Sequence, residues 1–135
     1  MYKNILVPIS PDHKGTVVKA LEIARHLSDQ DAKITALTVI EAVPGFASQY
    51  MPKGQKEETK NQALAALTER MRGADDVMTD VVNGHSGQTI LDYAKAEKVD
   101  CIVITSHRPG LKDFFLGSTA ARVVRYFKGS VHVLR

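Results

Sequence analysis

Short apolar runs alternate with amphipathic segments along the whole chain, and this alternation limits the folds open to it. Runs of strand length fall at residues 5–9, 33–40, 77–82, 101–105 and 130–134. Between them, apolar residues recur at helical spacing over residues 17–27, 57–72, 90–96 and 117–127. Short apolar runs are typical of buried strands, and the helical spacing is typical of helices that bury one face.

Strands and helices therefore follow one another in the order βαβαβαβαβ. Such alternation with short connections predicts a parallel sheet covered by helices on both faces. The 135 residues contain no internal repeat and no linker, and this length suits one ordinary domain. We expect a single α/β domain over residues 1–135, with a polar break at 28–31 and a long surface loop at 41–56.

The junction after the fourth apolar run carries the residues best suited to bind an anion. Thr105 ends that run, a polar loop with His107 and Arg108 follows, and the next helix opens at Gly117-Ser118-Thr119. Free N–H groups at a helix start, together with the helix dipole, attract phosphate, and a glycine there allows close approach. Loops at the carboxyl ends of strands are also where open α/β sheets bind ligands.

Other interpretations of these residues stay open. Ser118 also suits a helix cap, and Thr105 suits an ordinary strand end. The forked donors of Arg108 match a phosphate, but a solvated loop arginine fits the sequence equally well. For His107 we favour a hydrogen bond to the backbone over a catalytic role, because no nucleophile or orienting carboxylate stands beside it in the sequence.

Composition excludes several classes of protein. The formal net charge of +3 suits an anionic small molecule, but the basic residues are dispersed, which argues against nucleic acid. The single cysteine, Cys101, excludes an internal disulfide, and the histidines lack metal-ligand spacing. No apolar run is long enough to cross a bilayer and no signal peptide is recognisable, so we expect a soluble, cytoplasmic protein.

Several short motifs, in order along the whole chain, resemble the universal stress protein family. The opening Tyr2-Lys3-Asn4-Ile5-Leu6-Val7-Pro8 looks like its first strand, and Leu37-Thr38-Val39-Ile40 looks like the end of its second. Ser106-His107-Arg108-Pro109 and Leu116-Gly117-Ser118 are most similar to the small bacterial F/G subgroup. The resemblance implies a doubly wound, five-stranded parallel sheet of order 3-2-1-4-5, of the adenine-nucleotide alpha-hydrolase-like, Rossmann-like type.

The resemblance also implies which residues hold an adenine nucleotide. Pro8, Ile9 and Ser10 would line a crevice at the end of the first strand. Val39 would hold the adenine at the end of the second strand, through backbone hydrogen bonds and apolar contact. The fourth strand and the segment after it would complete the site with Ile104, Thr105, His107, Arg108, Gly117, Ser118 and Thr119.

The chain departs from the family's nucleotide-binding pattern in three ways. Thr105 and Arg108 stand at its first two glycine positions. One residue fewer than the pattern requires separates Arg108 from Gly117. Ser10 stands where many binding members carry Asp near the phosphates or their metal. A Mg²⁺ ion arriving with the nucleotide would therefore take most of its ligands from phosphate oxygens and water.

We expect a non-enzymatic stress-response sensor or regulatory protein that binds ATP or AMP. The resemblance implies a homodimer in which the edge strand Ser130–Leu134 pairs antiparallel with its copy, while the sequence names no other protein partner. The replaced glycines and Ser10 favour one alternative, a dimeric scaffold with a vestigial nucleotide pocket. A slow ATPase ranks third, because charge stabilisation is the one part of phosphoryl-transfer machinery visible in the sequence.

Overall fold

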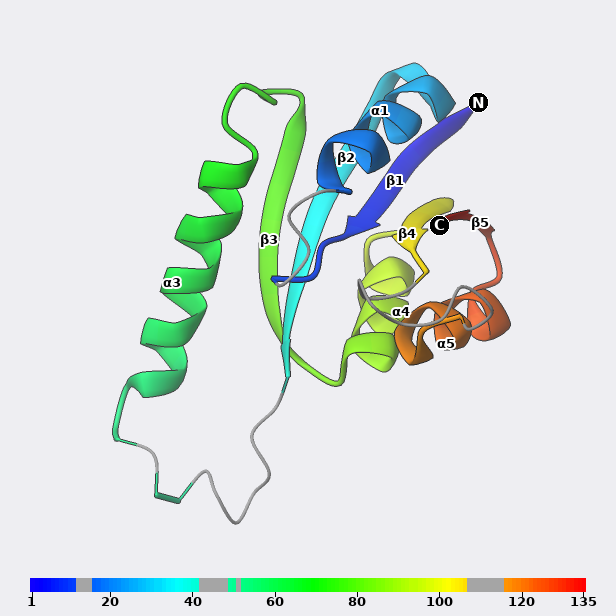
Figure 1. Cartoon of the computed structure of the whole chain (residues 1–135). Coiled ribbons are helices and arrows are strands. Elements are labelled where there is room, and N and C mark those ends of the chain that lie inside the picture. The colour runs from blue at the N-terminus through cyan, green and yellow to red at the C-terminus, as the bar shows by residue number, and fades with distance from the viewer. Residues whose placement is uncertain (12–15, 42–48, 51, 107–115) are drawn as a thin grey trace.

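The computed structural model describes residues 1–11, 16–41, 49–50, 52–106 and 116–135. Strands and helices alternate in it as the sequence predicts (Figure 1). The elements are β1 (Tyr2–Pro8), α1 (Val17–Leu27), β2 (Ser28–Glu41), α3 (Gln55–Arg70), β3 (Val77–Gly84), α4 (Ser86–Ala96), β4 (Cys101–Thr105), α5 (Ser118–Tyr126) and β5 (Ser130–Leu134).

The strands form one parallel sheet in the order β3-β2-β1-β4-β5, which confirms the predicted topology. β1 lies at the centre, where Ile5 pairs with Ile34 of β2 on one side and with Cys101 of β4 on the other. The chain therefore winds outward from β1 in both directions. β3 and β5 form the two edges of the sheet.

Helices cover both faces of the sheet, each over its own apolar cluster. Ile5 and Val7 of β1 pack in the cluster that α1 and α3 cover, while Leu6 between them packs in the cluster under α4 and α5. This alternation follows from the two-residue period of a strand. It explains why the apolar runs are continuous, since a strand buried on both faces has no polar side.

β2 is longer than the sequence predicts. It begins at Ser28, so residues 28–31, which we expected to form a polar break, are strand. Ser28 pairs with Tyr2, and the register shifts between Tyr2 and Asn4. Polar side chains are tolerated because Asp29, Gln30 and Asp31 are exposed in this part of the strand. Apolar periodicity detects burial, and this part of the strand is not buried.

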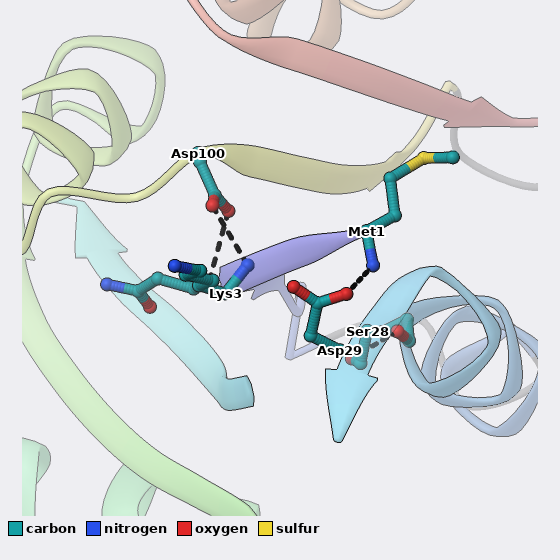
Figure 2. A network of polar contacts seen from close by, with 7 residues as sticks. Met1, Lys3, Ser28, Asp29 and Asp100 are labelled. Atoms are coloured by element: carbon teal, nitrogen blue, oxygen red, sulfur yellow. Dashed lines mark hydrogen bonds and ion pairs between the residues drawn. The ribbon is translucent and has the colours of Figure 1, made fainter. Parts of the chain in front are cut away.

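The amino end of the sheet is closed by a network of polar contacts (Figure 2). The Asp100 carboxylate accepts hydrogen bonds from the backbone N–H groups of Lys3 and Asn4 at the start of β1. Nearby, the amino group of Met1 pairs with Asp29 at the start of β2. These contacts fix β1 between its two neighbours at the end of the sheet where the strands begin. Within the described ranges, no helix combines the length and apolarity that a membrane span requires.

Candidate ligand-binding site

A crevice opens at the carboxyl ends of β1 and β4, where the strand order reverses. About 220 Å³ of empty space lies among its lining residues, a volume that includes open solvent. The end of β1, the first turn of α1 and the last residue of β4 line it through Val7, Pro8, Ile9, Ser10, Thr16, Val17, Ala20 and Thr105. In a doubly wound sheet, the chain leaves the two strands at such a switch point in opposite directions, which leaves room for a ligand.

The chain stays bound to the sheet for one residue beyond the end of β1. The Ile9 amide donates to the Leu37 carbonyl at 2.7 Å, and the Ile9 carbonyl accepts from the Thr38 hydroxyl at 3.1 Å. Thr38 is 4% exposed, so its hydroxyl makes this bond inside the protein. Ile9 is thereby held through both its N–H group and its carbonyl group, and the chain leaves the sheet at Ser10.

Ser10 and Pro11 are held from a second direction by Arg70, in the last turn of α3. Its Nη1 donates to the Ser10 carbonyl at 3.0 Å, and its Nη2 donates to the Pro11 carbonyl at 2.9 Å. The helix end that carries Arg70 is anchored by Leu67 and Met71, both buried in the cluster under α1 and α3. The first part of α3, by contrast, is exposed.

The start of α5 lies against the end of β4. Ser106, directly after β4, is 2% exposed. Its amide donates to the Leu134 carbonyl at 2.8 Å, and its carbonyl accepts a hydrogen bond from the Gly117 amide. Gly117 is the N-cap, and Ser118 is the first helical residue rather than the cap that we considered. The first amides of a helix lack intrahelical acceptors, and those of α5 lie beside the end of β4.

The structure brings some of the predicted site residues together and separates others. Pro8, Ile9, Ser10 and Thr105 line the crevice. The side chains of Val39 and Ile104 pack instead in the cluster under α4 and α5, where Ile104 is buried and Val39 half-buried. The predicted phosphate ligands Gly117, Ser118 and Thr119 stand at the start of α5 and do not line the crevice.

His107 and Arg108 lie outside the described residues, as does half of the loop expected at 41–56. Of that loop, Glu41 belongs to β2, while residues 55 and 56 begin α3.

Sequence reasoning missed several residues that line or support the crevice. Thr16, Val17 and Ala20 bring the start of α1 to its wall. The helical pattern of residues 17–27 assigned Val17 and Ala20 to the core, and both are indeed buried there as well. Their position directly after the first strand was the available signal. No local pattern distinguishes Thr38 or Arg70 from other strand and helix residues.

A second polar cluster joins the carboxyl end of β2 to the start of α4. The Glu41 carboxylate accepts hydrogen bonds from the Ser86 amide at 3.2 Å and from the Ser86 hydroxyl. His85 Nδ1 lies 3.8 Å from the same carboxylate. The hydrogen bond from Ser86 lowers the pKa of Glu41 below its usual value. Ser86 is the first residue of α4 and binds β2, while His85 takes the cap position.

A doubly wound parallel sheet with a crevice at its switch point defines a class of α/β proteins that bind small ligands at the carboxyl ends of their strands. The family model described as Universal stress protein family matches residues 1–135. The chain belongs to the universal stress protein family.

Similarity to named proteins and to solved structures supports this membership. Universal stress protein G of Salmonella typhimurium is 28% identical over the whole of both chains. Universal stress protein UspA from Lactobacillus plantarum is 26% identical, with a TM-score of 0.76 over 99% of this chain and 98% of that one. The hypothetical protein MJ0577 is 25% identical, with a TM-score of 0.81 over 99% and 96%.

Two further solved members of the family share the fold and hold nucleotides. One is a universal stress protein in complex with cAMP, 21% identical, with a TM-score of 0.63 over 99% of this chain and 97% of that one. The other is the universal stress protein from Archaeoglobus fulgidus in complex with dAMP, 16% identical, with a TM-score of 0.59 over 99% and 98%.

Proposed function

We propose that this protein binds an adenine nucleotide, ATP or AMP, at the carboxyl ends of β1 and β4 and acts as a non-enzymatic sensor or regulatory protein of the stress response. The observation that carries the proposal is the crevice at the switch point of the sheet, with the start of α5 bound beside it through Ser106 and Gly117. The complexes of two relatives with cAMP and dAMP support the choice of an adenine nucleotide.

Different parts of the nucleotide would contact different elements. The hydroxyls of Ser10 and Thr105 and the first amides of α5 suit the phosphates. Arg108, which stands between β4 and α5 in the sequence, would add charge. The adenine would extend toward the end of β2, where Val39 offers backbone groups, since its side chain packs under α4 and α5.

Any magnesium ion would be held mainly by the nucleotide itself. In the part of the chain that the structure describes, no group of three or more His, Cys, Asp or Glu side chains is placed to hold a metal. The crevice lining contributes hydroxyls and apolar groups, which suit phosphate oxygens better than a divalent cation.

The regulatory part of the proposal is a homodimer formed through β5. This strand pairs with β4 and ends the sheet, so its outer edge has no partner strand within the described chain. Exposed edges of this kind are usually covered or paired. A second copy of Ser130–Leu134 in antiparallel orientation would cover it. Analytical ultracentrifugation at tens of micromolar tests this, and a monomer alone would contradict it.

The first test of nucleotide binding is mass spectrometry of small molecules released from freshly purified protein by gentle denaturation. Near one equivalent of an adenine nucleotide per chain is the expected result, and it identifies the ligand. A thermal-shift titration with ATP, AMP and adenosine follows. A hundredfold excess over Kd raises the free energy of unfolding by about 2.7 kcal/mol. Adenosine serves as the control that lacks the phosphates.

Two results would replace this proposal. Protein that is purified empty and shows no thermal shift with millimolar ATP or AMP would favour the dimeric scaffold with a vestigial pocket. Steady-state ATP turnover above roughly 1 s⁻¹, the range of dedicated enzymes, would favour an ATPase instead. We expect turnover well below that rate.

A further inference from the structure

Arg70 connects α3 to the wall of the crevice through a pair of hydrogen bonds. Its guanidinium reaches the segment after β1 from a position sixty residues further along the chain and donates to two successive carbonyls, those of Ser10 and Pro11, at 3.0 and 2.9 Å. Ser10 is one of the residues that line the crevice, and its peptide carbonyl is thus bound from the side of α3.

We propose that Arg70 is a positioning residue of the nucleotide site, which orients Ser10 toward the bound phosphates by clamping the Ser10 and Pro11 carbonyls. This inference rests on the proposed function and names a residue that the site needs although it does not line the crevice. In the described part of the chain, no other group donates a hydrogen bond to either carbonyl. The direction in which Ser10 leaves the sheet therefore depends on Arg70.

The chemistry of the contact requires an arginine. A guanidinium presents several N–H donors in one rigid plane and can bind two acceptors at once. A lysine ammonium has a similar charge but sits on a flexible stem and lacks this fork. Replacing Arg70 with Lys therefore separates the geometry of the clamp from its charge.

Among the described residues, no carboxylate compensates the positive charge that the clamp brings near the crevice. Both acceptors are neutral carbonyls, and among the described residues no carboxylate lies within ion-pair distance of Arg70. Arg72, two residues further on, instead pairs with Glu69 at 3.4 Å and is 81% exposed. The charge of Arg70 attracts an anionic ligand in the crevice, so the charge and the clamp both favour binding.

Binding of ATP and AMP is measured by isothermal titration calorimetry for the wild type, Arg70→Lys and Arg70→Met, with Arg72→Lys and Arg72→Met as matched controls. We expect both Arg70 variants to weaken Kd by about tenfold or more, because Ser10 is then no longer held in its binding position. We expect both Arg72 variants to stay within about twofold of the wild type, since Arg72 makes only an exposed ion pair. Circular dichroism confirms that each variant is folded at the titration temperature.

A double-mutant cycle with Ser10→Ala separates positioning from a general structural role. If Arg70 acts through Ser10, the Ser10→Ala substitution weakens binding clearly in the wild type and by less than about twofold in Arg70→Lys. An equal effect in both backgrounds, including none in either, overturns the proposal. So does an Arg70→Lys variant that binds as the wild type does. A wild type that binds neither ATP nor AMP overturns the proposed function together with this inference.

Discussion

Asn4 and Asp100 bind each other twice where β1 and β4 begin. The Asp100 amide donates to the Asn4 carbonyl at 3.0 Å, and the Asp100 carboxylate accepts from the Asn4 amide at 3.1 Å. The same carboxylate accepts from the Lys3 amide at 2.9 Å, and the Asp100 carbonyl accepts from the Ser130 amide at 3.2 Å. One residue thus joins the amino ends of β1, β4 and β5.

Replacing Asp100 with Ala is therefore expected to destabilise the fold. The substitution removes the acceptor of two backbone amides, and the expected loss in the free energy of unfolding is about 1–2 kcal/mol, because these amides are partly solvated. Urea unfolding followed by circular dichroism measures it. Asp31→Ala is the matched control, since Asp31 is exposed on β2, and it should change stability by less than about 0.5 kcal/mol. Equal effects of the two substitutions would contradict the role of Asp100.

The strand order and the two helical layers could be predicted because they rest on local patterns that report burial. Residues 28–31 show the limit of that signal, since a strand segment exposed to water carries no apolar pattern. The crevice could be predicted in part. Ser10 and Thr105 could be predicted because they stand at the ends of two apolar runs in the sequence. Arg70 could not, because it lies sixty residues from Ser10 and meets it only in the folded chain.

The ion pair of Arg25 and Asp76 predicts a pH-dependent contribution to stability. Arg25 of α1 donates from Nε and Nη2 to the two Asp76 oxygens at 2.7 and 2.8 Å, and this contact holds the pKa of Asp76 below its ordinary value of 3.8. A carboxyl whose pKa is lowered by folding stabilises the protein above its unfolded pKa, and the contribution is lost as the pH falls through the folded pKa.

The Asp76→Asn substitution isolates this contribution. We expect it to cost about 0.5–1 kcal/mol at pH 7, a modest value because both side chains are about half exposed. The cost should shrink as the pH is lowered from about 5 toward 3, because the unfolded carboxyl takes up protons there before the folded one, whose pKa is lower. Urea unfolding of both proteins across this range measures it. A cost that stays constant with pH would show that the charge of Asp76 is not its source.

The thiol of Cys101 should be inert in the folded protein. Cys101 is 1% exposed, and burial, together with the nearby Asp100, raises the pKa of its thiol to about 11. Since the thiolate is the reactive form, a disulfide reagent at pH 8 should label the native chain at less than about a hundredth of the rate in urea. Unfolded protein should give one thiol per chain. Rapid labelling of the native protein would mean that β4 opens readily.

Two buried threonines of β2 offer a matched test of how the end of β1 is held. Thr38 and Thr35 are each 4% exposed, but the Thr38 hydroxyl donates to the Ile9 carbonyl, whereas the described residues provide no hydrogen-bond partner for the Thr35 side chain. Thr38→Val leaves a buried carbonyl without its donor, so we expect a loss of about 1–2 kcal/mol in the free energy of unfolding. Thr35→Val removes a buried hydroxyl that contributes no such bond, so stability should stay the same or increase. Urea unfolding of both variants decides the matter, because equal losses would mean that the bond to Ile9 contributes nothing of its own.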